Sequence, residues 1–153
     1  MLIFFIISFA TGAIYFFTLY HYFNSWNAAE EFTELSDIYP FLSIVVPIFN
    51  DSRVLEDLLS DLSQLNYPEG KYEVLLVNDH STDRTPEIAG KFAASRENFF
   101  FLDNYYQQGK KFAIKSGIEK ASSDFIITTD ADCRVPSDWL RYFAAVISEY
   151  PGS

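Results

Sequence analysis

Residues 41–59 read FLSIVVPIFNDSRVLEDLL, and this stretch holds the pattern that decides the fold. Leu42 to Val46 form a short apolar run rich in β-branched residues, which predicts a buried strand. Residues 47–51 (PIFND) then have the composition of a turn. After the turn, leucines recur at helical spacing with acidic residues between them, at Leu55, Leu58, Leu59, Leu62 and Leu65. The stretch therefore predicts a strand, a turn and an amphipathic helix in succession.

The same alternation of strand and helix continues to the end of the chain. Strands are predicted at residues 72–77 (YEVLLV), 99–102 (FFFL) and 125–129 (FIITT), and helices at 85–95 and 111–120 and after residue 138. The Thr85 hydroxyl is expected to cap the second helix, and Ser137 with Asp138 the last one. Alternating strands and helices favour right-handed crossovers and a parallel, doubly wound α/β sheet.

The first 26 residues differ in character from the rest of the chain. From Leu2 to Phe23 the sequence reads LIFFIISFATGAIYFFTLYHYF, and the first charged side chain is that of Glu30. Because roughly 20 apolar residues cross a ~30 Å hydrocarbon core, we expect a transmembrane helix at residues 2–26, a polar linker at 27–40 and one domain at 41–153. A cleaved signal peptide is the alternative, but it requires a basic segment and a small-residue cleavage site, which this stretch lacks.

Composition narrows the classes of partner and metal. The 153 residues include 11 Lys and Arg against 21 Asp and Glu, a net charge of -10. Such a charge repels nucleic acid and anionic lipid headgroups, so attachment to a membrane has to come from apolar burial. A single cysteine, Cys133, excludes an internal disulfide, and only two histidines are present. Any metal ion is therefore expected to have oxygen ligands.

Acidic residues follow two of the predicted strands. Asp79 comes after the second strand, and Asp130 and Asp132 come directly after the fourth. The carboxyl ends of parallel strands meet at one edge of the sheet, where ligands bind. Carboxylates that converge there repel one another unless a cation or a ligand lies between them. The Asp130-Ala131-Asp132 triplet thus predicts a Mg²⁺ or Mn²⁺ site that takes further ligands from a substrate diphosphate.

Each of these residues also has a plainer interpretation when taken alone. Acidic triplets such as 130–132 are common on solvated loops, and Asp79 fits an Asx turn in its own loop as well as it fits a ligand contact. Gly109, Lys110 and Lys111 open the third helix, where free backbone N–H groups and lysine charge suit a phosphate. A lone lysine such as Lys110 is nevertheless more often solvated. Asp83 is expected to brace the loop before Thr85, and His80 to be a loop residue.

Four ordered blocks together resemble the family 2 glycosyltransferases of the GT-A fold. The blocks are SIVVPIFN (43–50), NYPEGKYEVLLVNDHSTDRT (66–85), GKKFAIKSGI (109–118) and TTDADCRVPSDWL (128–140). The resemblance covers about residues 41–140 and implies a Rossmann-like, mainly parallel nucleotide-sugar-binding domain. It implies that Asp79 reads the nucleotide base, usually uracil, with Pro47 and Asn50 forming the wall beside it. It also implies that Asp130 and Asp132 hold the ribose, the metal and the diphosphate, with Lys110 near the phosphates.

The resemblance further implies a reaction. In this family a glycan or lipid acceptor attacks a nucleotide-sugar, with inversion and with help from a metal ion; a UDP-sugar is the expected donor. Family members place the general base in a later Glu-Asp segment, so that base is expected beyond residue 153 and this chain is expected to be the donor-binding half. Asn78 departs from the pattern, since many members carry Asp there. Because donors are cytoplasmic, a single-pass anchor in the cell membrane with a cytoplasmic domain is expected.

Three alternatives were weighed against this interpretation. A D-x-D phosphatase of the haloacid dehalogenase type needs Thr or Val two places after the second Asp, where Arg134 stands, and carries the motif on its first strand. A nucleotidyltransferase usually has a glycine-rich basic loop after strand one, and residues 47–51 contain neither glycine nor base. The non-enzymatic alternative is an inert, membrane-tethered fragment.

Overall fold

The structure, a computed structural model, describes residues 1–27, 35 and 37–149 and divides the chain into two units, residues 1–33 and 34–153. The first unit contains helix α1 (Leu2–Asn27), whose residues 2–26 are long and apolar enough to cross a membrane. A signal sequence near an N-terminus meets the same test of length and composition. The Thr18 hydroxyl donates to the Ile14 carbonyl at 2.8 Å, which satisfies one polar group within this apolar helix. Most of the predicted linker, 27–40, lies outside the described residues.

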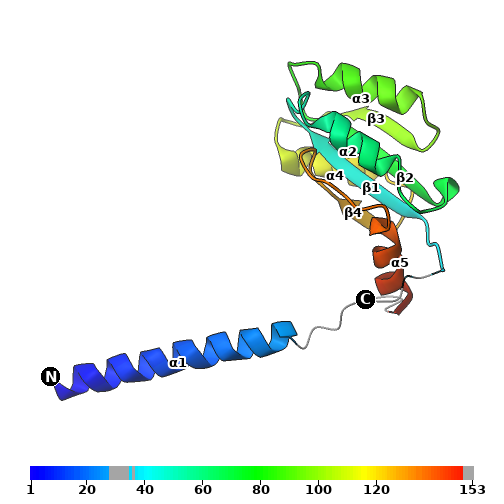
Figure 1. The fold of residues 1–153 in the computed structure, drawn as a ribbon. Helices are drawn as coiled ribbons and strands as arrows, with labels where there is room; N and C mark the ends of the chain where they lie inside the picture. The colour runs from blue at the N-terminus through cyan, green and yellow to red at the C-terminus, as the bar shows by residue number, and fades with distance from the viewer. Residues whose placement is uncertain (28–34, 36, 150–153) are drawn as a thin grey trace. The chain divides into compact units, whose positions relative to one another are not determined.

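The second unit is built on a four-stranded parallel sheet with the order β3-β2-β1-β4 (Figure 1). The strands are β1 (Leu42–Ile48), β2 (Tyr72–Asn78), β3 (Phe99–Asp103) and β4 (Ile126–Thr128). β1 pairs with β2 along its whole length, whereas β4 pairs only with Ser43–Val45. The chain adds β2 and β3 on one side of β1 and then crosses to the other side for β4. The strand order therefore reverses between β1 and β4, the place where parallel sheets bind ligands.

Helices cover both faces of this sheet (Figure 1). The larger core joins alternate residues of β1 and β2 to α2 (Leu55–Leu62), α3 (Thr85–Ala94) and α5 (Trp139–Glu149). On the other face, α4 (Lys110–Lys120) packs on Val45, Leu75 and Val77. Burial on both faces explains why β1 and β2 are nearly continuous apolar runs. A short 3₁₀ helix, Glu69–Lys71, precedes β2.

Two local predictions are wrong. Pro47 and Ile48 belong to β1 and not to the turn; β4 pairs with Ser43–Val45 and so ends before the proline, which lacks an N–H for a ladder. Thr85 is the first residue of α3 and not its cap. Its backbone N–H donates to Asp83 Oδ1 at 2.9 Å, so the Asp83 carboxylate serves the helix start. The prediction that Asp83 braces this loop is confirmed, since its other oxygen accepts the Ser52 N–H.

Candidate functional site

A cleft of about 530 Å³ opens at the carboxyl edge of the sheet, between the ends of β1 and β4. It is lined by residues that follow β1, β2 and β4 and by the start of α4, at positions 47–49, 51, 79, 108–110 and 130–132. Of the residues predicted for the site, the structure brings Pro47, Asp79, Lys110, Asp130 and Asp132 together in this cleft. Their contacts with a ligand stay a prediction, because these positions alone do not show one.

Lys110 and Asp130 form an ion pair across the cleft. The Lys110 Nζ lies 2.7 Å from the Asp130 carboxylate, and both side chains are about half exposed. The hydrogen bond to Asp130 raises the pKa of Lys110, and the charges of Asp130 and Asp132 add to this effect. Because an exposed pair of this kind contributes only about 0–1 kcal/mol, the lysine can leave Asp130 for a phosphate at little cost.

Asp51 is a further acid in the cleft, beside Asp79, Asp130 and Asp132, and is absent from the residues predicted for the site. It lies on the loop after β1, where its Oδ2 accepts the Phe49 N–H at 2.7 Å. Burial raises the pKa of the Asp51 carboxyl, and the nearby charges of Asp132, Asp83 and Asp130 raise it further. In the sequence Asp51 stands among turn residues and carries no distinguishing pattern. Its position at the end of a parallel strand was the only available signal.

These carboxylates fit a hard divalent cation. The carboxylates of Asp51, Asp130 and Asp132 line the cleft and offer oxygen ligands, which Mg²⁺ and Mn²⁺ prefer. Among the described residues, no three His, Cys, Asp or Glu side chains are grouped closely enough to hold a metal by themselves. An ion that keeps its waters and takes a diphosphate needs only one or two protein carboxylates. The Lys110 ammonium on Asp130 shows that a cation is already favourable at this position.

A second ion pair holds the segment that follows Asp132. Arg134 donates to both carboxylate oxygens of Asp61 on α2, at 2.6 and 2.8 Å, and the Val135 N–H donates to the same group at 3.2 Å. The hydrogen bond from Arg134 lowers the pKa of Asp61. This bidentate arrangement fixes both distance and orientation. The loop carrying the two cleft carboxylates is thereby attached to α2.

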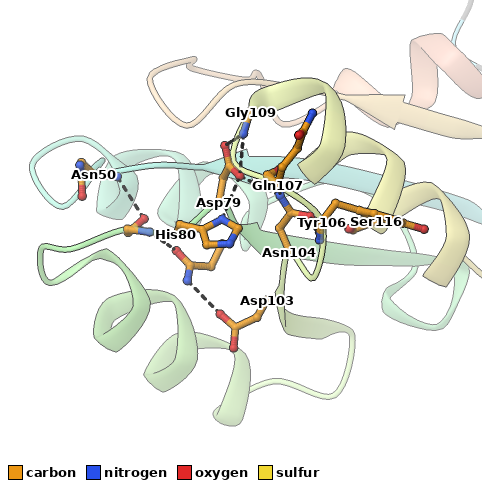
Figure 2. A network of polar contacts seen from close by, with 11 residues as sticks. Asn50, Asp79, His80, Asp103, Asn104, Tyr106, Gln107, Gly109 and Ser116 are labelled. Atoms are coloured by element: carbon orange, nitrogen blue, oxygen red, sulfur yellow. Dashed lines mark hydrogen bonds and ion pairs between the residues drawn. The ribbon is translucent and has the colours of Figure 1, made fainter.

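Asp79 is buried, with an exposed fraction of 4%, and its carboxylate points at the start of α4 (Figure 2). The Gly109 N–H donates to Asp79 Oδ2 at 2.8 Å, and the Asn104 amide donates to Oδ1 at 2.8 Å. Both of these donors lie in the loop before α4, and among the described residues the only polar contact of this carboxylate with its own loop is the neighbouring His80 ring, whose Nδ1 lies 3.4 Å from Oδ1. The Gly109 N–H, expected to be free for a phosphate, is instead bound to Asp79.

Asn50 and Asn78 support the loops around the cleft. Asn50 lies next to the lining residues, with φ 55°, and its Oδ1 accepts the Thr82 N–H at 2.9 Å. The Asn78 side chain donates its amide N–H to Asp103 at 2.9 Å, and its Oδ1 accepts the Ser81 N–H. An aspartate at position 78 would face the Asp103 carboxylate directly. This contact gives a physical reason for the departure from the family pattern at Asn78.

Comparison with known proteins identifies the family. The fold is a parallel α/β domain with acids at its switch point, and residues 43–152 match the family described as Glycosyl transferase family 2. The chain belongs to this family.

Curated relatives agree with this assignment. Glycosyltransferase AglE of Haloferax volcanii is 35% identical over 109 residues, covering 71% of this chain and 36% of that protein. Beta-monoglucosyldiacylglycerol synthase of Nostoc sp. is 35% identical over 111 residues, covering 71% and 24% respectively. Poly-beta-1,6-N-acetyl-D-glucosamine synthase of Staphylococcus epidermidis is 34% identical over 97 residues, covering 63% and 23%. The chain thus spans about a quarter to a third of the length of these relatives.

Solved structures show the same fold. S. aureus TarS 1-349 in complex with UDP is 26% identical, with a TM-score of 0.66, over 72% of this chain and 33% of that one. Mannosyltransferase PcManGT from Pyrobaculum calidifontis, in complex with GDP-Man and Mn²⁺, is 23% identical with a TM-score of 0.72, over 94% and 42%. The α/β domain is therefore GT-A-like, as the sequence predicted.

Proposed function

We propose that the cleft binds a nucleotide-sugar, with a UDP-sugar as the expected donor, for a metal-dependent, inverting transfer to a glycan or lipid acceptor. The observation that carries this proposal is the meeting of Asp79, Lys110, Asp130 and Asp132 in one cleft at the switch point. A relative of known structure, S. aureus TarS 1-349, is described in complex with UDP and with UDP-GlcNAc. This likeness supports a uridine nucleotide as the first ligand to test.

Each residue predicted for the site has a part in this proposal. Asp130 and Asp132 would hold the ribose and a Mg²⁺ or Mn²⁺ ion, and through the ion the diphosphate; the ion would supply charge stabilisation to the departing diphosphate. Lys110 exchanges its contact with Asp130 for a phosphate oxygen, and Asp79 contacts the base. Pro47 lies in the wall beside the base, and Asn50 supports that wall through the loop after β2.

Electrostatics explains why a cation belongs in this cleft. Four carboxylates line the cleft, those of Asp51, Asp79, Asp130 and Asp132. They oppose a diphosphate, itself an anion, and the charge of Lys110 offsets only part of this repulsion. A divalent ion converts the repulsion between protein and diphosphate into attraction to both. For the same reason, the nucleotide-sugar donor should bind weakly when a chelator removes the divalent ion.

The place of the reaction is proposed from helix α1. Its apolar length suits a single-pass anchor in the cell membrane, with the α/β domain on the cytoplasmic side where donors occur. The printed names of two relatives describe a glucosyl lipid synthase and a polysaccharide synthase. Both acceptor classes therefore stay in the proposal.

Calorimetric titration of the full chain in detergent micelles tests donor binding. The wild type is expected to bind UDP with Mn²⁺ and to lose this binding with chelator. Asp132→Ala is expected to abolish it, because the variant removes a metal ligand from the cleft. The matched control is Asp124→Ala, an exposed acid at the opposite, amino end of β4, which should bind as the wild type does. Binding that ignores both Mn²⁺ and Asp132 would contradict the proposal.

A further inference from the structure

Asn104 is a buried asparagine, 5% exposed, that follows β3 and lies outside the residues lining the cleft. Its amide nitrogen donates to Asp79 Oδ1 at 2.8 Å and to the Gln107 carbonyl at 3.2 Å. Its amide oxygen accepts the Tyr106 N–H and the Ser116 hydroxyl, each at 3.0 Å. All four hydrogen-bonding positions of this side chain are therefore used. Figure 2 labels Asn104 together with these partners.

These bonds join three elements of the domain. The Asn104 N–H donates to the Asn78 carbonyl at 2.9 Å, which attaches the residue to the end of β2. The Ser116 hydroxyl attaches it to the middle of α4. Within residues 104–107, the backbone of Tyr106 and of Gln107 also bonds to the Asn104 side chain. Asn104 thus holds the connection between β3 and α4 in place.

The connection ends at the cleft. Asp79, held on one side by Asn104, accepts the N–H of Gly109, which precedes the first residue of α4 and has φ 143°. Glycine adopts this φ with little strain, so the backbone can turn there into the helix. The next residue is Lys110, whose Nζ lies 2.7 Å from Asp130 on the far side of the cleft. The bonds at Asp79 and Gly109 therefore set where that lysine starts.

We propose that Asn104 is a positioning residue of the donor site, which acts through Asp79 and Gly109 to place Lys110 over Asp130. This inference rests on the proposed function for its consequence in donor binding. An amide is required at position 104 for a physical reason. Asp79 is a buried carboxylate and needs N–H donors, so an aspartate at 104 would replace a donor with a second negative charge at hydrogen-bonding distance.

The test compares Asn104→Asp with Asn66→Asp in the full chain in detergent. Asn66 also donates its amide to an aspartate, Asp138 Oδ1 at 2.8 Å, but it is exposed and lies outside the cleft lining. The two variants thus make the same chemical change at two places. Both are measured by peptide-resolved amide hydrogen exchange and by calorimetry with UDP and Mn²⁺, at a temperature where circular dichroism shows both folded.

For Asn104→Asp we expect amide exchange in residues 104–112 to accelerate by about tenfold or more, because the carboxylate pair at 79 and 104 repels. The dissociation constant for UDP with Mn²⁺ should rise at least about tenfold as well. Peptides from β1 and β2 should exchange as in the wild type. Asn66→Asp should leave unchanged both the amide exchange in residues 104–112 and the dissociation constant for UDP with Mn²⁺. A merely structural role for Asn104 would lower the unfolding temperature and leave the affinity of the folded chain intact.

Ser116→Ala provides a second, milder variant in case Asn104→Asp does not fold. It removes only the hydroxyl that donates to Asn104, and alanine suits the interior of α4. Exchange at 104–112 and the dissociation constant should both rise by about two- to fivefold, the effect of one hydrogen bond. Unchanged values in a folded Asn104→Asp, or in Ser116→Ala if the former is unfolded, would overturn the inference.

The two arms separate this inference from the proposed function. If the wild type does not bind UDP, the proposed function fails, and faster exchange at 104–112 in the variants still supports the structural half of the inference. If the wild type binds UDP and a folded Asn104→Asp binds equally well, the positioning role fails and the proposed function stands.

Discussion

The two edges of the sheet each carry acidic residues, but Glu73 at the amino edge has neutral hydrogen-bond donors, whereas Asp130 at the carboxyl edge is paired with the charged Lys110. At the amino edge, Glu73 of β2 is buried, 6% exposed. Its carboxylate accepts the Ser43 hydroxyl and the Ser122 N–H, each at 2.6 Å, and the Ser122 hydroxyl at 3.1 Å. Neutral donors therefore satisfy this acid, and it joins β1, β2 and the segment before β4.

At the carboxyl edge, by contrast, Asp130 and the neighbouring acids line the cleft, and Asp130 forms an ion pair with Lys110. The amino edge even has the larger hollow, about 730 Å³ against about 530 Å³. Volume alone would thus favour the amino edge over the proposed ligand site. The comparison suggests that incompletely satisfied charge at a switch point, and not the size of a hollow, is the feature that points to the carboxyl edge.

Of the variants that test the difference between the two edges, Glu73→Ala should have the largest effect. Its loss leaves the Ser43 hydroxyl and the Ser122 N–H without their acceptor, which should lower the free energy of unfolding by about 3 kcal/mol. Urea denaturation followed by circular dichroism measures this change. The affinity of the folded chain for UDP should stay at the wild-type value. A loss of affinity without a loss of stability would show that the amino edge is also a ligand site.

Gly117→Ala should come next in size. A Cβ at Gly117 would run into Val45 and Val77, so α4 would have to move away from the sheet, at a cost of roughly 2 kcal/mol. Because Lys110 begins α4, UDP affinity should fall too. Gly90→Ala in α3 is the matched control; nothing lies within 4 Å of a Cβ there, and the fold should gain about 0.5–1 kcal/mol. Thermal unfolding and calorimetry of both variants test this, and equal behaviour would contradict the close approach of α4.

Asp51→Asn should have the smallest effect, and its sign depends on pH. The pKa of Asp51 is raised in the fold, so the protonated carboxyl stabilises the folded state below the ordinary range near 3.8, and this stability is lost as pH rises through the raised pKa. In the absence of metal, the unfolding temperature of the wild type should therefore fall relative to Asp51→Asn as pH increases from acid to neutral. Saturating Mn²⁺ with UDP should reduce that difference. If the unfolding temperatures of the wild type and of Asp51→Asn differed by the same amount at every pH, the raised pKa of Asp51 would be refuted.

The strands show how far the sequence reaches. β1, β2 and β3 lie where the apolar runs predicted them because strands covered on both faces must be apolar at nearly every position. Pro47 was misplaced because a proline usually ends a strand, and only the short reach of β4 makes it harmless. The sequence places Asp130 and Asp132 at the carboxyl edge because they follow a strand, and parallel topology brings such strand ends together.

Asp51 and Asn104 show what the sequence could not predict. Each stands among turn-forming residues, and its importance comes from partners elsewhere in the fold: the charge of Asp132 for Asp51, and Asp79 and Ser116 for Asn104. Asp79 illustrates the same limit, since its place after β2 was predictable and its bond to Gly109 was not. No local pattern encodes these contacts, whose partners lie between 12 and 81 positions apart in the chain.

By itself, the sequence determined an apolar helix of membrane length, an alternation of strands and helices, and acids placed after strands, since all three follow from local periodicity and chain connectivity. The tertiary structure alone decided which acids are satisfied and which face the cleft. Glu73 and Asp130 are both carboxylates near strand ends. Only the packing around them gives Glu73 its hydroxyl and N–H donors and leaves Asp130 paired with the exposed Lys110 charge. Hydrogen bonds and charge pairs act over a few ångströms, so they depend on how distant segments pack and not on their order in the chain.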